Sequence, residues 1–400
     1  MELSLARADN RITYLSNIFY YIGIIAFFAE SIILNSTYSV VLGDALTVVL
    51  KLFPLLLMVM SIATKSLLKY SYILLLLVCV ACGLLSYRNS GSTTIITIVL
   101  LIFGALDLPI KYIAKYVQCT IVFTCIFVVI SALLGVIPNI YRPGMYGFIP
   151  YDLGFGYGSQ IGYCIESMLI CQIIRTHGRL MNMQTVGYCA AALLYYLFWH
   201  FSSQFIIVIA LLVICHIPFK TNYIVTKTKV LLISLIFPIF GFGYLLFNYS
   251  YTSAIPWMNR LNQLLTWRLG LGYNALHNFG ISIFGKKISF SGFGINGDTQ
   301  IFSGAGGQQT IAGSGDYDYV DSSYLLAPLL FGLVCFGLIL CAYSVILSTF
   351  YKLHYKTLVF VVLMIGLQCC INPILHQLVY NPILLFVIPF IQELQRRQSE

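Results

Sequence analysis

The residues with the greatest capacity for chemistry are a few arginines in the two longest polar segments of the chain, residues 138–157 and 249–321. Arg142 lies in the first segment, and Arg260 and Arg268 lie in the second. On one continuous helix, positions eight apart differ by only about 80°, so Arg260 and Arg268 are expected to face one ligand. The planar guanidinium matches phosphate oxygens in pairs, and several arginines together suit a diphosphate. The alternative is that each arginine extends to lipid headgroups.

Aromatic side chains surround Arg142 in the stretch YRPGMYGFIPYDLGFGYGSQIG. Tyr146 and Tyr151 are candidates to stack on the faces of sugar rings, and the neighbouring glycines permit close backbone approach. Aromatic residues also gather at membrane interfaces without any ligand. The stretch therefore leaves glycan binding and membrane anchoring both open.

Two further residues are candidates for proton transfer. Glu166 lies inside an apolar stretch, where a charge is costly and by default indicates function. His277 lies in the second polar segment and is a candidate base, although a lone histidine is more often structural. The sequence has no Walker loop, dinucleotide fingerprint or HExxH motif, and its 12 cysteines lack zinc-site spacing. We therefore predict no cofactor and no metal site.

Long apolar stretches must position these residues. The 400 residues are 60% hydrophobic and 9% charged, which excludes a soluble globular protein. The stretches are continuously apolar, which indicates helices rather than the alternating strands of a barrel. We predict an all-α polytopic membrane protein, a single integral domain over residues 1–400, with about twelve transmembrane helices. The predicted spans are approximately 16–34, 39–62, 70–87, 92–110, 116–137, 158–175, 184–199, 203–219, 230–248, 322–349, 357–375 and 380–393.

The positive charges alternate with these spans. Fifteen of the 22 Lys and Arg residues lie in every second joint: Arg7, Arg11, Lys65, Lys69, Lys111, Lys115, Arg175, Arg179, Lys220, Lys227, Lys229, Lys352, Lys356, Arg396 and Arg397. Lys and Arg near span ends stay cytoplasmic, so both termini are predicted inside, and residues 138–157 and 249–321 are predicted to be extracytoplasmic loops. The net charge of +9 is spread over the inner joints, which favours contacts with lipid headgroups over nucleic-acid binding.

The larger loop, between the ninth and tenth predicted spans, has two parts. Ile255–Phe284 has helical spacing of its leucines, and Pro256 suits a first helical turn. We expect this part to lie along the outer membrane face as one interfacial helix. Residues 285–315 are rich in glycine and serine, which predicts irregular structure.

Several motifs, taken in order, resemble those of the O-antigen and capsule polymerase (Wzy) family, particularly its members from exopolysaccharide clusters. LNQLLTWRLGLGYNAL followed by IFG is similar to the family's arginine-bearing helix and FG turn. YVDSSYLLAPLLFGLV is similar to its entry into the next helix, and YNPILLFVIPFI to its closing helix. In the first loop, GYGSQ stands where the family has HPN, so this loop departs from the family pattern.

The resemblance implies a multi-pass enzyme of polysaccharide biosynthesis in the bacterial plasma membrane. Such a metal-independent glycosyltransferase joins undecaprenyl-diphosphate-linked oligosaccharide units at the outer face, without nucleotide sugars. Arg142 and Arg268, assisted by Arg260, would bind the diphosphate. The candidates for the base at the acceptor hydroxyl are Asp321 first, then His277 and Glu166, and the candidate glycan contacts are Tyr146, Tyr151 and Tyr324.

Two other functions stay open. A flippase or other transporter of lipid-linked oligosaccharides fits twelve spans equally well, although transporters more often have two matching halves, which this sequence lacks. The related O-antigen ligase, which transfers finished chains, differs little in sequence pattern. The candidate partners are the lipid-linked oligosaccharide, membrane lipids, and the chain-length regulator and flippase of the same pathway, with no nucleic acid.

Overall fold

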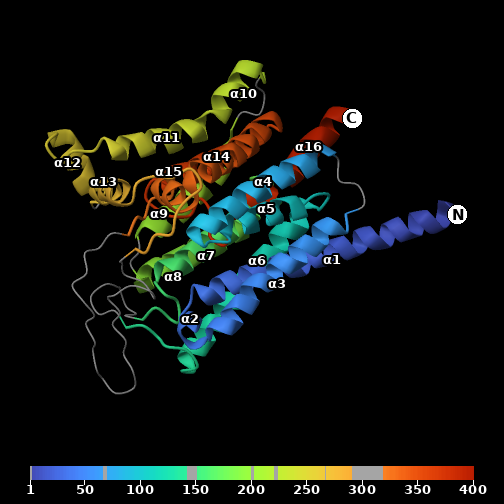
Figure 1. Ribbon diagram of the computed structural model, residues 1–400, viewed down its shortest axis with the longest axis horizontal. Coiled ribbons are helices and arrows are strands. Elements are labelled where there is room, and N and C mark those ends of the chain that lie inside the picture. The colour runs from blue at the N-terminus through green and yellow to red at the C-terminus, as the bar shows by residue number, and fades with distance from the viewer. Residues whose placement is uncertain are drawn as a thin grey trace. The chain divides into compact units, whose positions relative to one another are not determined.

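Every regular element in the described part of the chain is a helix (Figure 1). The computed structural model describes residues 2–65, 70–141, 151–199, 202–219, 224–265, 267–290 and 319–400, with residues 2–13 as backbone only. The elements are α1 (Glu2–Leu34), α2 (Tyr38–Val41), α3 (Asp44–Ala63), α4 (Tyr70–Ser90), α5 (Thr94–Gly104), α6 (Ile110–Leu133), α7 (Ser159–Arg175), α8 (Asn182–Trp199), α9 (Ser202–His216), α10 (Lys227–Ser234), α11 (Ile236–Tyr249), α12 (Pro256–Leu264), α13 (Arg268–Phe279), α14 (Ser323–Lys352), α15 (Lys356–Gln368), the 3₁₀ helix η1 (Pro382–Phe386) and α16 (Val387–Ser399).

Six helical stretches within the described ranges are long and apolar enough to cross a membrane. They are Tyr14–Leu34, Asp44–Ala63, Tyr70–Ser90, Ile110–Leu133, Lys227–Tyr249 and Ser323–Lys352. Three shorter apolar helices accompany them: Thr94–Gly104, Ser203–His216 and Lys356–Gln368. The structure therefore agrees with a helical, polytopic membrane protein, while the count of twelve spans and their orientation stay predictions.

The exposed faces of these helices are apolar. On α3, Leu52 and Leu56 are 55% and 59% exposed, and on α4, Leu77 and Val78 are 60% and 50% exposed. Exposed apolar surface costs about 25 cal/mol per Å² in water. A helix that is apolar on its exposed face as well as its packed face is typical of a membrane span.

The described residues form two compact units, each interrupted in sequence. The first unit comprises described residues within Met1–Ile73 and Leu100–Ile217, and the second comprises those within Leu74–Val99, Pro218–Gly292 and Gly315–Glu400. Each unit therefore brings together helices that are distant in the chain.

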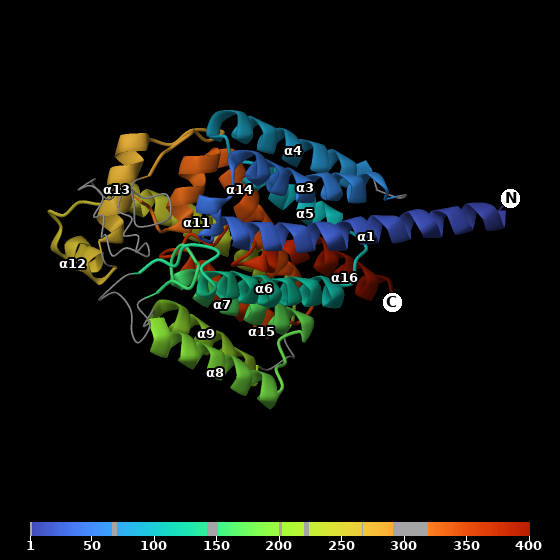
Figure 2. The same ribbon diagram turned by 90° about the horizontal axis from the view of Figure 1, so that it is seen from below.

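In the first unit, α1 packs against α3 and α6, α6 packs against α7, and α8 pairs with α9 (Figure 2). Small polar residues let α1 and α3 approach closely. The Ser16 hydroxyl donates to the carbonyl of Ser61 at 2.8 Å, and the Ser61 hydroxyl donates to the carbonyl of Ser16 at 3.0 Å. Such reciprocal contacts between small residues are typical of helix pairs in membranes.

In the second unit, α14 is the central helix and packs against α10, α11, α15 and α16. Gly241 on α11 lies against Leu340, where an added Cβ would approach the Leu340 side chain to 2.7 Å. The rings of Phe237 and Tyr343 stack with centroids 4.7 Å apart. Helices α10 and α12 lie at opposite ends of α11 (Figure 1). Helix α10 thus lies at one end of α11, and α12 and α13 lie at the other end.

Two predicted elements differ from the structure. The predicted last span, 380–393, is a 3₁₀ turn followed by α16, whose 13 residues cover only about 20 Å and end in an exposed polar stretch. The predicted single helix over Ile255–Phe284 is two helices, α12 and α13, followed by an extended segment. Pro256 does begin α12, as its fixed φ angle predicts.

Candidate functional site

A sharp bend separates α12 from α13 and changes how the loop presents its arginines. Trp267, at the start of α13, has a φ of 65°, a left-handed conformation that ends one helix before the next begins. Asn262 on α12 stabilises the bend: its side-chain oxygen accepts a hydrogen bond from the Gly270 N–H at 3.0 Å, and its amide donates to the Tyr251 hydroxyl at 2.9 Å. The bend therefore has its own buried polar support.

This bend corrects the prediction that Arg260 and Arg268 lie on one continuous helix. Arg260 is exposed on α12, whereas Arg268 is the first residue of α13 and partly buried. The 80° relation required continuous helical geometry through residue 267, which the left-handed Trp267 interrupts. The helical spacing therefore gives no reason to assign Arg260 the same ligand as Arg268.

Helix α13 is held tightly against α11 and α14. Leu245, Ala275, Leu276, Leu325 and Leu329 form a buried cluster with Val320 between these helices. At Gly272, an added Cβ would lie 2.5 Å from Leu325 Cδ1 and 2.6 Å from Asn248 Oδ1. The absence of a side chain at this glycine therefore permits the close approach that places Arg268.

The start of α14 is fixed by the segment that follows α15. The Ser323 N–H donates to the carbonyl of Cys369 at 2.9 Å, and the Ser323 hydroxyl donates to the carbonyl of Asn372 at 2.5 Å. In return, the Leu375 N–H donates to the Ser323 hydroxyl oxygen at 3.0 Å. These bonds lie just after Asp321 and define the position of its backbone.

Arg268 and Asp321 meet in an ion pair. Arg268 Nε lies 3.4 Å from Asp321 Oδ2, and each side chain is 30% exposed. The pair joins two of the predicted site residues that are 53 positions apart in the sequence. Both α13 and α14 begin here, and the N-terminus of a helix favours negative charge. The arrangement suits an anion that approaches from the exposed side.

The carboxyl group of Asp321 is a stronger base than that of an exposed aspartate. Burial raises the pKa of Asp321 above its ordinary value, although the charge and hydrogen bond of Arg268 act in the opposite direction. Burial, together with the nearby charge of Asp321, also raises the pKa of Tyr319 to about 12. Next to the ion pair, Tyr319 is therefore a neutral phenol at physiological pH.

His277 lies on a different side of α13 from Arg268. The two residues are nine positions apart, which corresponds to about 180° around the helix axis. The His277 ring lies between the rings of Tyr249 and Tyr273, with centroids 5.0 and 3.9 Å away, and its Nδ1 is 2.9 Å from the Tyr273 carbonyl. Because a carbonyl only accepts, this contact places the proton on Nδ1. The structure does not bring His277 to the ion pair.

The other predicted residues fall outside this site or outside the described ranges. Arg142 and Tyr146 lie in residues 142–150, which the structure does not describe. Tyr151 is 40% exposed in the first unit, and its carbonyl accepts a hydrogen bond from Trp199 Nε1 at 3.0 Å. Glu166 is buried on α7, also in the first unit.

Tyr324 does not fit the predicted role of a glycan contact. Its side chain is fully buried, and its hydroxyl donates to the carbonyl of Gly366 at 2.8 Å. A ring stacks on a sugar only through an exposed face, and Tyr324 has none. Its position two residues into the apolar α14 explains this burial, because that turn packs against α15.

Sequence reasoning missed a break in α14 next to the site. Gly332 has φ 84° and ψ 167°, so the helical hydrogen bonding of α14 is interrupted there. Segment 281–285 packs against the backbone at this break. The N–H groups of Leu333 and Val334 donate to the carbonyls of Ser282 and Ile283 at 3.0 and 3.1 Å. The Ser86 hydroxyl donates to the carbonyl of Phe331 at 3.2 Å. A Phe-Gly pair occurs on both sides of this contact, at 284–285 and 331–332, and was its available sequence signal.

The break lies deep in the candidate span. Gly332 is about 14 Å along α14 from Ser323, roughly half of the hydrocarbon thickness. Irregular backbone at such depth requires protein cover and internal hydrogen bonds, and the segment that contains Gly285 supplies both. Segment 281–285 thus packs into the break in α14.

Comparison with protein-family models, with curated proteins and with solved structures finds no match to this chain.

Proposed function

We propose that this protein is a polymerase that joins undecaprenyl-diphosphate-linked oligosaccharide units into polysaccharide at the outer face of the bacterial plasma membrane. The observation that carries the proposal is the ion pair between Arg268 and Asp321. An arginine beside a carboxylate of raised pKa provides both the electrostatic and the proton-accepting groups that such a transfer requires.

In the proposed reaction, the acceptor hydroxyl attacks the anomeric carbon of the donor glycan. The new glycosidic C–O bond forms as the bond to the lipid diphosphate breaks, and the diphosphate leaves with the bonding electrons. Asp321 accepts the proton of the attacking hydroxyl. Arg268 stabilises the charge that develops on the leaving diphosphate.

The ion pair is compatible with both roles. A guanidinium has five N–H donors in a fixed fork, so a contact at Nε leaves capacity for phosphate oxygens. Asp321 orients that fork in the absence of substrate. When a diphosphate takes over the charge of Arg268, the lowering influence of Arg268 on the Asp321 pKa weakens, and the carboxylate becomes a still stronger base.

A carrier of lipid-linked oligosaccharides is the second candidate, and the break in α14 favours it. Transporters commonly bind substrate where a membrane helix is interrupted near the midplane. The related ligase uses the same donor chemistry and differs in its acceptor.

Reconstitution separates these functions. Full-length protein in liposomes that contain only lipid-linked repeat units is expected to lengthen them without nucleotide sugars. Products are resolved by gel electrophoresis and mass spectrometry. In parallel liposomes that also contain a different lipid acceptor, transfer to that acceptor with no lengthening of repeat units would indicate the ligase. An absence of longer products, with lipid-linked units crossing the bilayer only when the protein is present, would replace the polymerase proposal with the carrier.

A further inference from the structure

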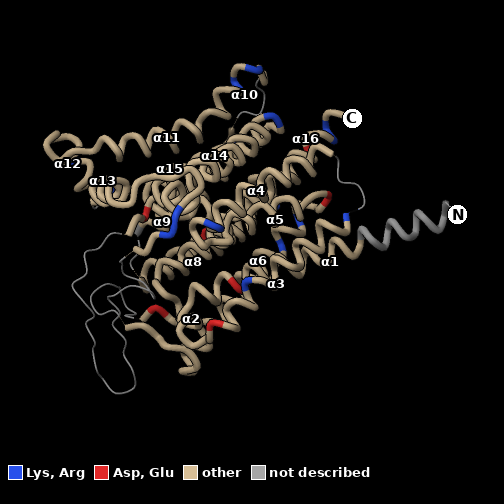
Figure 3. Tube along the Cα trace, in the orientation of Figure 1, with Lys and Arg blue, Asp and Glu red and all other residues tan. Residues whose placement is uncertain are grey.

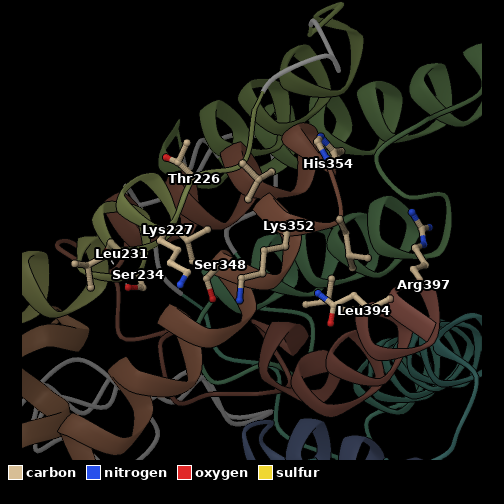
Figure 4. Close-up of a pocket in the computed structure, with 13 residues that line it drawn as sticks. Thr226, Lys227, Leu231, Ser234, Ser348, Lys352, His354, Leu394 and Arg397 are labelled. Atoms are coloured by element: carbon tan, nitrogen blue, oxygen red, sulfur yellow. Dashed lines mark hydrogen bonds between the residues drawn. The ribbon is translucent and has the colours of Figure 1, made fainter. Parts of the chain in front are cut away.

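A cavity of about 760 Å³ lies at the far end of α14 from the ion pair (Figure 4). Its walls come from three elements of the second unit: α10 with the two residues before it, the end of α14 with the two residues after it, and the end of α16. The cavity and the ion pair lie near opposite ends of the 30-residue α14. It is therefore a distinct site, and nothing in the proposed reaction uses it.

The charge that lines this cavity is positive. Among the described residues, its lining includes Lys227, Lys352 and Arg397 and contains no Asp or Glu. Figure 3 shows the Lys and Arg positions of α10, α14 and α16 at the same end of the second unit. Alternating charge along the sequence predicts this end to be cytoplasmic. Cationic pockets between membrane helices on that side suit the headgroups of anionic lipids.

The three cations are not equivalent. Arg397 lies 2.7 Å from the Glu393 carboxylate and also donates to the Tyr355 hydroxyl, so its charge is already compensated. Among the described residues, no carboxylate lies within 4.0 Å, the ion-pair distance, of the amine of Lys227 or Lys352. In Figure 4 their amines lie on either side of Ser348. Two amines without a carboxylate partner on one cavity wall attract an anion.

Half of the remaining lining is polar, with Thr226, Ser234, Ser348, His354 and Gln398, and the other half is apolar. Val225, Val230, Leu231, Leu353 and Leu394 line the cavity, and Leu231 is 58% exposed. Leu232 and Leu235, close to Leu231 in the sequence, are also exposed, at 61% and 40%. Cationic groups beside exposed leucines match an amphiphile with an anionic head and a hydrocarbon chain.

We propose that Lys227 and Lys352 bind the phosphate group of an anionic ligand in this cavity, and that Leu231 and the exposed leucines near it select a leaflet phospholipid over a soluble phosphate. This site is independent of the proposed polymerase activity. Both lysines are exposed at helix ends, so their replacement by glutamine removes charge without disturbing the core.

Native mass spectrometry of the delipidated full-length protein tests the site, with phosphatidylglycerol, phosphatidylcholine and glycerol phosphate as separate probes. The Lys227→Gln/Lys352→Gln variant is expected to bind phosphatidylglycerol about 30-fold more weakly, since each lysine near an anionic headgroup contributes about 1 kcal/mol and 1.4 kcal/mol is tenfold. Lys229→Gln/Lys356→Gln is the matched control, because it removes the same charge beside the cavity and neither residue lines it.

The three probes assign the source of the phosphate. Selective loss of phosphatidylglycerol in the cavity variant supports a lipid site, and selective loss of glycerol phosphate alone assigns the site to a soluble ligand. Equal losses in the cavity variant and the control variant would show a diffuse basic surface and overturn the proposal. Unchanged binding of both anions in the cavity variant would also overturn it.

Discussion

The cations at the two ends of α14 differ in whether a carboxylate pairs with them. At its first end, Arg268 is compensated by Asp321 at 3.4 Å, and both are partly buried. At its last end, Lys227 and Lys352 are exposed and lack a carboxylate partner among the described residues. A compensated, partly buried cation is oriented for one ligand geometry, whereas uncompensated exposed cations attract anions generally. The first end thus suits selective chemistry and the second suits attachment.

Removal of the arginine at the first end is expected to have the largest effect. Arg268→Ala should lower the rate of polymer lengthening about 100-fold or more, the range for loss of a group that stabilises developing charge. Arg268→Lys should stay impaired, because an ammonium lacks the planar fork. The measurement is product length in reconstituted liposomes at matched protein levels.

Arg260→Ala is the matched control, because Arg260 is exposed on the separate helix α12. It should retain nearly the normal rate. Normal polymer from Arg268→Ala, or equal losses from the two variants, would remove the special role given to the compensated arginine.

The next effect concerns the carboxylate. Asp321→Asn should lower the rate about 100-fold, a typical contribution of a general base. The base acts when deprotonated, so the wild-type rate should fall as pH decreases through the raised pKa of Asp321, at a higher pH than for an ordinary aspartate. Asp321→Asn should lack this acid limb. A pH profile with the same acid limb in both proteins would assign the base to another residue.

A smaller effect tests how the first end is built. Gly272→Ala places a methyl group 2.5 Å from Leu325 Cδ1, so α13 must shift and the free energy of unfolding should fall by about 1–3 kcal/mol. Thermal unfolding in detergent measures this. Gly243→Ala is the control, because a Cβ there meets no atom within 4 Å. A stable Gly272→Ala protein with normal activity would mean that close packing of α13 does not position Arg268.

The smallest effect is expected at His277. Because His277 points about 180° away from Arg268 around α13, His277→Ala should change the rate by less than about threefold, the size of a surface substitution worth about 0.5 kcal/mol. Initial rates across pH 5–8 provide the measurement. A large loss confined to His277→Ala, with Asp321→Asn unaffected, would move the base to the histidine.

Helix positions followed from the sequence, and local interruptions did not. Apolar stretches of span length give helices because the backbone must satisfy its own hydrogen bonds in lipid. Pro256 gave the start of α12 through its fixed φ. The bend at Trp267 depends instead on Asn262 reaching Gly270 and Tyr251, a tertiary arrangement that the spacing of leucines does not encode.

The candidate site was predictable only in part, because its residue types are visible in the sequence and its tertiary contacts are not. Arg268 and Asp321 stood out by residue type, but their contact depends on the packing of α13 against α14 across residues distant in sequence. Tyr324 was expected from the family resemblance of the stretch YVDSSYLL, but its side chain is buried in the core. Residue type indicated the chemistry, whereas facing directions required the fold.

Because of the break at Gly332, two amide protons within α14 form hydrogen bonds with segment 281–285, so their exchange depends on whether that segment is attached. The N–H groups of Leu333 and Val334 are bonded to Ser282 and Ile283 instead of to the preceding turn of α14. Their hydrogen–deuterium exchange therefore measures detachment of segment 281–285, while the amides further along α14 measure opening of the helix itself. If exchange at Leu333 and Val334 becomes faster when substrate binds, segment 281–285 detaches from α14 on binding. This measurement needs no mutation.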